Sequence, residues 1–188
     1  MSVMVDIDDL MRRIAIRAAS DGADLPACVG AAQVAQAEAQ LGFALHPVLT
    51  RLYREVADGG FGPGYCLLPL LGPGSSVVGE YLEQREASVG VEYPVWPKGV
   101  VSILTWGCGM YAAVDCLDPD GRVLLFEPNA YGGGSWADCW YLHSPNLTAW
   151  LESWLAATGW FDEDAPDWDD VSGPRPWEHA AVRLSSGV

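Results

Sequence analysis

Basic residues and long apolar runs are both scarce in this sequence. Ten Lys and Arg stand against 25 Asp and Glu, which gives a formal net charge of −15 over 188 residues. A field of that sign repels phosphate backbones, so the composition disfavours direct binding to nucleic acid and favours basic partners. No apolar run approaches the ~18 residues of a membrane span, and the first residues are acidic where a signal peptide is basic. We therefore expect a cytoplasmic protein that does not bind a membrane.

Paired cysteines are also missing. The five cysteines are odd in number and scattered without a C-x-x-C pair, which argues against a disulfide framework. A zinc site would have to gather Cys108, Cys116, Cys139 and His143, whose spacings lack the tight pairs of structural zinc sites. Asp115, Asp118 and Asp120 do not fit the twelve-residue span of a calcium loop. We expect free thiols, no metal and no cofactor.

Catalytic signatures are absent as well. No G-x-S-x-G motif occurs, and the glycine-rich stretches at 72–74 and 132–134 carry no phosphate-loop Lys. Cys108 and His143 are the one Cys–His pair to weigh, but no helix start follows Cys108 that would lower its pKa. The sequence therefore predicts a protein that is not an enzyme. A hydrolase that uses a pair of its many carboxylates stays open as an alternative.

Apolar residues recur at three- and four-residue spacing in the first third of the chain. This period predicts helices over 6–20 and 31–41, and a third helix that Pro47 opens. Ser75 or Ser76 is expected to cap a fourth helix that runs to Ala87. Between the third and fourth helices, the short apolar run at 65–71 predicts a buried strand.

The middle of the chain changes to strand patterns. Strands are predicted over 100–106, 110–116 and 123–126, and Asp118-Pro119-Asp120-Gly121 is typical of a hairpin turn between the last two. A short strand around 138–142 is expected next, and then a final helix that Ser144 caps and Gly159 ends. Helices first, an antiparallel meander and a closing helix predict an α+β fold, as a single domain over 1–159.

Residues 160–188 are predicted to form an acidic tail. Six acids fall between Asp162 and Asp170, beside three large aromatic side chains. Aromatic anchors ringed by carboxylates are what a basic protein surface would bind, although a merely solvated tail is the alternative. The predicted partner-binding residues are Trp160, Phe161, Asp162, Glu163, Asp164, Asp167, Trp168, Asp169 and Asp170.

Several further segments follow one another in an order shared with a known family. The first consists of Glu38 and Ala39-Gln40-Leu41-Gly42-Phe43-Ala44-Leu45-His46-Pro47, followed by Leu52-Tyr53 and Asp58-Gly59-Gly60-Phe61-Gly62. Later come Leu67-Leu68-Pro69-Leu70 and Trp106-Gly107-Cys108-Gly109, with the hairpin beyond them. This series resembles the SUKH superfamily, the Smi/Knr-type domains, whose opening runs E-x-x-LG-x-x-LP, then a helix, then N-G-G. The resemblance covers about 31–155, and Asp58 replaces the usual Asn.

The resemblance implies an α+β fold with helices packed on an antiparallel or mixed sheet, and it supplies no catalytic residues. Bacterial members look like immunity proteins that neutralise polymorphic toxins, often nucleases. Because nucleases carry positive charge to hold phosphates, a chain of net charge −15 is steered toward them. We therefore expect a non-enzymatic immunity protein for a cognate toxin, with a basic nuclease domain as one candidate. The alternative is an intracellular protein-interaction scaffold of the cell-wall-regulator type.

Overall fold

The computed structural model describes residues 6–21, 24–159 and 174–186. Within them, five strands form one antiparallel sheet in chain order. The strands are β1 (Val100–Gly107), β2 (Met110–Asp115), β3 (Val123–Phe126), β4 (Trp140–Ser144) and β5 (Arg175–Pro176). The helices are α1 (Ile7–Ser20), α2 (Ala31–Leu41), α3 (Pro47–Glu55), α4 (Val77–Ala87), α5 (Leu147–Leu155) and α6 (Ala180–Ser185). The predicted α+β fold is confirmed.

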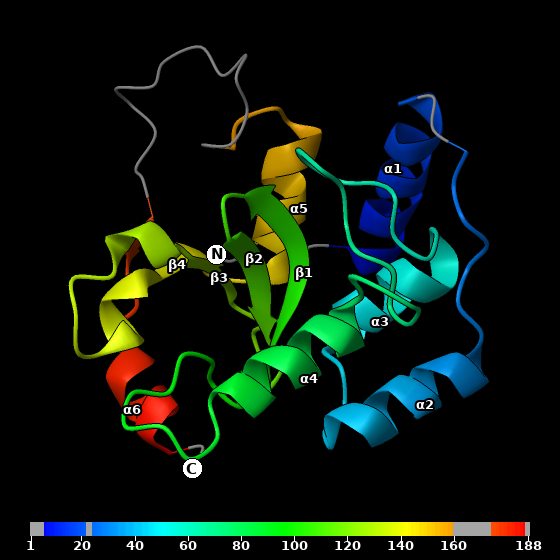
Figure 1. Cartoon of the computed structure of the whole chain (residues 1–188). Coiled ribbons are helices and arrows are strands. Elements are labelled where there is room, and N and C mark those ends of the chain that lie inside the picture. The colour runs from blue at the N-terminus through cyan, green and yellow to red at the C-terminus, as the bar shows by residue number, and fades with distance from the viewer. Residues whose placement is uncertain (1–5, 22–23, 160–173, 187–188) are drawn as a thin grey trace.

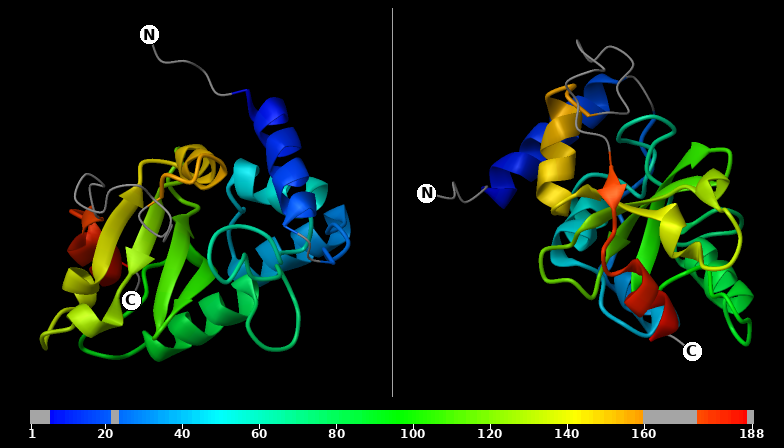
Figure 2. Two further views of the ribbon diagram at one scale, coloured as in Figure 1. Left: turned by 90° about the horizontal axis from the view of Figure 1, so that it is seen from above. Right: turned by 90° about the vertical axis from the view of Figure 1, so that its left-hand side faces the viewer.

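The helices surround the sheet rather than forming one layer. Figure 1 shows α1, α2 and α3 together on one side of the sheet, with α6 at the opposite side. Both views in Figure 2 show α1 beside α5, and Arg13 of α1 donates to Glu152 of α5. Because helices stand on both sides, even the short strand β3 is buried at all four of its residues.

The first four helices begin where the sequence predicts. The Asp6 side chain caps α1 by accepting from the backbone N–H groups of Asp8 and Asp9, and the Ser76 hydroxyl caps α4 by accepting from Gly79. Such caps satisfy backbone donors that have no partner inside the helix. Leu10 and Ile14, one turn apart on α1, are both fully buried, as the apolar spacing requires.

The predicted hairpin between β2 and β3 is also confirmed. Its strands pair in register, Asp115 N–H donates to Arg122 C=O at 3.0 Å, and Gly121 N–H donates to Asp118 C=O at 2.9 Å. Gly121 takes φ +63°, a conformation that costs glycine little and other residues more. A Cβ there would also lie 2.8 Å from the His46 ring. Both the backbone conformation and the lack of space therefore require glycine at this position.

The strand predicted at 65–71 is wrong. Leu67 and Leu70 are buried as expected, but the segment forms no strand. Only one ladder-like bond ties it to β1, from Leu68 N–H to Ile103 C=O at 2.8 Å. Side chains form hydrogen bonds with other backbone groups of the segment. Tyr53 donates to Leu68 C=O, and Asp58 accepts from Leu70 N–H, both at 2.7 Å.

The predicted boundaries of the last helix are wrong as well. Ser144 ends β4 instead of capping the helix, and the cap is Asn146, whose Oδ1 accepts from Ala149 N–H at 2.8 Å. Helix α5 ends at Leu155, before Gly159. Ser, Asn and Pro are all favoured around a helix start, so the sequence 144–146 offers two competing caps.

Two elements near the C-terminus were not predicted from the sequence. Strand β5 pairs with β4, and Trp177 N–H donates to Trp140 C=O at 2.9 Å. Helix α6 is tied to the sheet by Arg183, which donates to both oxygens of the buried Asp115 carboxylate. Residues 174–186 are therefore part of the folded unit.

Candidate protein-binding surface

The partner-binding residues predicted from the acidic tail lie outside the described residues. They are Trp160, Phe161, Asp162, Glu163, Asp164, Asp167, Trp168, Asp169 and Asp170. Their role remains a proposal. The geometry of a candidate site therefore comes from the described part of the chain.

The Cys–His pair is not assembled for catalysis. Cys108 is exposed at the β1–β2 turn, with φ +51°. His143, on β4, lies between the rings of Trp106 and Trp150, with ring centroids 6.5 and 6.2 Å away. Burial lowers the pKa of His143 to about 4, so its imidazole is neutral at pH 7. His143 is half-buried and packs against tryptophan rings.

The remaining candidate ligands serve the fold. Burial raises the pKa of the Cys116 thiol to about 12 and also raises that of Cys139, so both stay protonated. Asp115 is bound by Arg183, while Asp118 accepts from Asp120 N–H and pairs with Arg122 at 2.8 Å. Within the described ranges, no group of three His, Cys, Asp or Glu residues could hold a metal ion.

Exposed aromatic side chains gather around the β1–β2 turn. Tyr65 is 72% exposed, and its ring lies 3.6 Å from the Cβ position of Gly107 on one side of the turn. On the other side, Pro128 lies 3.1 Å from the Cβ position of Gly109. Cys108 stands between these two neighbours. The turn thus joins the loop before α4 to the segment after β3.

The segment after β3 continues this patch. Tyr131 is 37% exposed and stacks on Trp136, with ring centroids 3.9 Å apart and the planes within 12° of parallel. Trp136 in turn packs against the buried Phe126 at 6.2 Å. A stacked pair that rests on the core is rigid, so it can contact a partner at little entropic cost.

Carboxylates accompany the rings, and the described donors to them are neutral. Glu80 accepts from Ser75 at 2.7 Å and from Tyr111 at 3.1 Å. Burial, followed by the charge of Glu80, raises the pKa of Tyr111 to about 12, with a smaller contribution from Glu83. Glu127 accepts from the backbone and side chain of Asn129 at 2.8 and 2.7 Å. These carboxylates keep their charge directed at solvent.

We call this patch the hairpin surface. It comprises the β1–β2 turn with its flanking rings and acids, namely Tyr65, Glu80, Glu83, Cys108, Tyr111, Glu127, Tyr131, Trp136 and Asp138. Arg85 is the only basic residue in the sequence of α4, and residues 127–139 contain none. The patch offers apolar contact area and negative charge but no nucleophile beside a base. Aromatic side chains and carboxylates of this kind are common at protein–protein interfaces.

The glycine-rich stretch 132–134 was the local signal for this surface. It lies between Tyr131 and Trp136, whose rings stack on each other. The other members come from distant segments, so no sequence spacing brings them together. Tyr65 and Pro128 are 63 residues apart in number yet flank the same turn, and Tyr131 follows Pro128 by three residues.

The shared sequence landmarks hold the fold beneath this surface. Glu38 accepts from Leu45 N–H at 2.9 Å, and Asp58 holds Leu70. Gly59 has φ +75°, and a Cβ on it would lie 2.6 Å from Leu67 C=O. These residues therefore connect α2, α3 and the 58–70 loop.

These landmarks belong to a described family. The SMI1 / KNR4 family (SUKH-1) matches residues 29–153. The chain is therefore a member of the SMI1 / KNR4 family, which includes immunity-protein-like domains. A search of curated proteins finds no matching relative. Across the described ranges, none of the helices has the length and apolar character needed to cross a bilayer.

Proposed function

We propose that this chain is a non-enzymatic immunity protein that acts in the cytoplasm and neutralises a cognate protein toxin by covering a basic surface. The hairpin surface carries the proposal, since it places exposed rings beside carboxylates that neutral donors hold. Membership of a family with immunity-protein-like domains supports the same function.

Charge and aromatic contacts make separate contributions to binding. A net charge of −15 steers a basic toxin toward the protein, and a nuclease domain is a fitting target because it holds phosphates with positive charge. Once in contact, Tyr65 and Tyr131 supply amphipathic rings, the kind of side chain that dominates binding energy at interfaces. Inhibition then follows from covering the toxin's site.

The acidic segment from Trp160 to Asp170 is proposed to add to this steering. Its six acids, Asp162, Glu163, Asp164, Asp167, Asp169 and Asp170, are close in sequence to three aromatic residues. Replacing the six by Asn and Gln tests this contribution separately from the hairpin surface. A lower association rate at low salt supports it, and an unchanged rate leaves the hairpin surface as the whole site.

The test of the function is a titration against the toxin encoded beside this gene. The purified chain is added to a fixed amount of toxin, and the remaining toxin activity is measured. A blocker inhibits with an end point at one chain per toxin, because each complex consumes one molecule. Inhibition at a small fraction of that amount would show catalysis and contradict the proposal. A chain that does not bind the toxin but binds proteins of wall synthesis would be the scaffold.

A further inference from the structure

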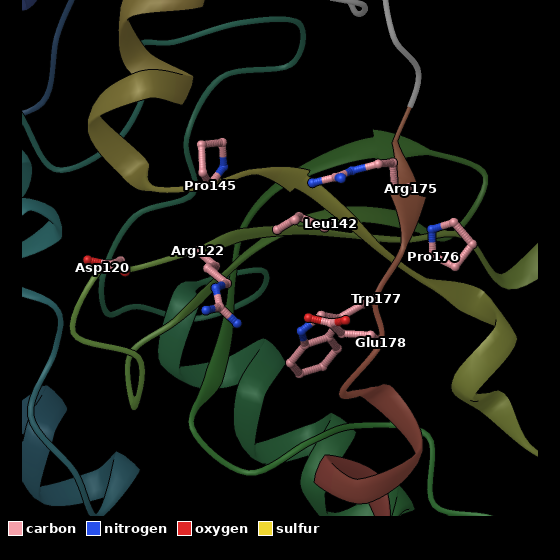
Figure 3. Close-up of a pocket in the computed structure, with 8 residues that line it drawn as sticks. All are labelled: Asp120, Arg122, Leu142, Pro145, Arg175, Pro176, Trp177 and Glu178. Atoms are coloured by element: carbon pink, nitrogen blue, oxygen red, sulfur yellow. The ribbon is translucent and has the colours of Figure 1, made fainter. Parts of the chain in front are cut away.

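A hollow of about 370 Å³ opens between β5 and the β2–β3 turn (Figure 3). Its volume lies within the range of sites for small ligands. Its lining includes Arg122, Leu142, Pro145, Arg175, Pro176 and Trp177. We call it the β5 pocket.

The sheet register puts two arginines on the same face. Arg175 pairs with Leu142, which pairs with Leu124, so these three side chains share a face. Arg122 precedes Leu124 by two residues and Trp177 follows Arg175 by two, so both point the same way. Two of the ten basic residues of an acidic chain thus meet at one hollow.

Trp177 supplies a third donor. The side chain is 4% exposed, and its Nε1–H has no hydrogen-bond acceptor among the described residues. Figure 3 shows the indole nitrogen on the edge of the ring that is turned toward Arg122 and the hollow. The Trp177 backbone N–H donates to the Trp140 carbonyl, and the Arg183 guanidinium lies over the ring, 5.5 Å from its centroid. A buried donor without an acceptor is costly, so a ligand that accepts from it is favoured.

We propose that the β5 pocket binds an organic carboxylate. Arg122 is held by an Asp118 oxygen 2.8 Å from its Nε, which leaves the other end of the guanidinium directed into the hollow. A planar guanidinium matches a carboxylate with two parallel hydrogen bonds. Arg175 and the Trp177 indole add donors from the opposite wall. Leu142, Pro145 and Pro176 form an apolar wall for the ligand's carbon body.

The rim selects for a single negative charge. Asp120 and Glu178 also line the pocket, and Glu178 is exposed beside His179. A second negative charge on the ligand would meet these carboxylates, so inorganic phosphate is expected to bind more weakly than a monocarboxylate. The carboxylate can belong to a small acid or to the C-terminus of a peptide, and the two sources are separated below.

The test follows the indole N–H signals of the full chain labelled with ¹⁵N-tryptophan. Trp177→Phe keeps the aromatic ring and removes one signal, which assigns it. Benzoate is expected to shift that signal saturably, whereas benzamide, its neutral counterpart, leaves it unmoved. A short peptide with a free C-terminus that binds more tightly than benzoate, while its amidated form does not bind, identifies a chain end as the source. Weaker binding by the free peptide identifies a small acid.

Matched variants locate the donors. Arg175→Gln is expected to weaken benzoate binding about tenfold, because a charged hydrogen bond is lost. Arg54→Gln, an exposed arginine on α3, removes the same charge elsewhere and leaves binding unchanged. Glu178→Gln tightens binding. Equal shifts with benzamide, no saturable shift with either benzoate or the free peptide, or equal losses in the two arginine variants would overturn the proposal. None of these outcomes depends on a toxin.

Discussion

The hairpin surface and the surface formed by α1, α3 and α5 both carry carboxylates, but the groups that hold them differ. On the helical surface, arginine holds each one: Arg12 and Arg13 bind Asp9, Arg13 binds Glu152, and Arg51 binds Asp8 and Glu55. We call this surface, formed by α1, α3 and α5, the helical surface. On the hairpin surface, hydroxyl and amide groups hold Glu80 and Glu127.

We infer that the difference separates carboxylates that stabilise the fold from those proposed to recognise a partner. Hydrogen bonds from Arg13 and Arg12 hold the pKa of Asp9 below its usual value, and Arg13 does the same for Glu152. A carboxylate paired with arginine in this way has most of its electric field cancelled by that neighbour. The pair between Arg13 and Glu152 also ties α1 to α5. A carboxylate held by neutral donors keeps its full charge for a partner. The number of exposed acids is therefore a poor guide to where an acidic protein binds.

The largest expected effect concerns one exposed apolar side chain on each surface. Tyr131→Ala should weaken toxin binding about thirtyfold, or about 2 kcal/mol, because it removes a stacked interface anchor. Ile16→Ala removes an apolar side chain that is 58% exposed on α1 and should leave affinity unchanged. Calorimetric titration with the toxin measures both. Equal losses in the two variants would remove the distinction between the surfaces.

Acid should affect stability in two different pH ranges. Burial lowers the pKa of His143, which packs against Trp150 of α5, from 6.5 to about 4. The unfolded chain therefore binds a proton that the folded chain does not, and stability falls as pH drops below 6.5. The free energy of unfolding should decrease by about 2 kcal/mol between pH 7 and pH 5.

Urea unfolding at each pH measures this dependence. His143→Gln should flatten the curve in that range, whatever it does to stability at pH 7. His179→Gln, which replaces an exposed histidine, is the matched control and should keep the slope. A slope that survives in His143→Gln would show that another group titrates there.

Matched changes of charge should separate the surfaces kinetically. Replacing Glu83, Glu127 and Asp138 by their amides should lower the toxin association rate about tenfold at low salt, because steering charge is lost at the docking site. The control replaces Asp8, Asp21 and Glu55, which form ion pairs with Arg17 and Arg51, and should lower the rate much less. Stopped-flow mixing over a range of salt concentrations gives both rates. Equal slowing would mean that only net charge matters.

A change at a single arginine of the helical surface should lower stability without weakening toxin binding. Arg13→Gln should lower the free energy of unfolding by about 1 kcal/mol, since it breaks contacts to two carboxylates on two helices. Toxin affinity should stay the same. Denaturation midpoints and binding titrations of the same preparation check both statements, and a loss of affinity without a loss of stability would place binding on the helical surface.

The smallest effect lies at low pH. Arginine lowers the pKa of Asp9, Glu55 and Glu152, so each adds stability above its unfolded value that is lost as pH falls through its folded one. Below about pH 4 the wild-type chain should therefore lose additional stability. Arg13→Gln should lose less stability over the same range. An identical loss in the two proteins would show that these ion pairs do not contribute.

The features that could be predicted from sequence depend on neighbours along the chain. Asp6 and Ser76 cap helices through groups two or three residues away, and Pro119 and Gly121 shape their own turn. The 65–71 segment could not be predicted in this way. Its backbone groups are taken by Tyr53 and Asp58, so its conformation depends on side chains from another element.

The candidate site was harder to predict for the same reason. The chemistry expected of it, aromatic anchors among carboxylates, is present on the hairpin surface, but the sequence pattern points to 160–170 because only there do such residues cluster along the chain. Tyr65, Cys108 and Pro128 become neighbours only when the sheet forms. The β5 pocket depends in the same way on β5 pairing with β4.

The most direct test of the central claim uses two native cysteines. Cys108 lies within the hairpin surface and Cys28 lies in the segment before α2, and both thiols are exposed. Their alkylation is followed by mass spectrometry in the free chain and in its complex with the toxin. We expect the toxin to slow reaction at Cys108 to about a tenth or less while Cys28 keeps its rate, since access controls thiol reactivity. Protection of Cys28 with Cys108 unchanged would contradict the account.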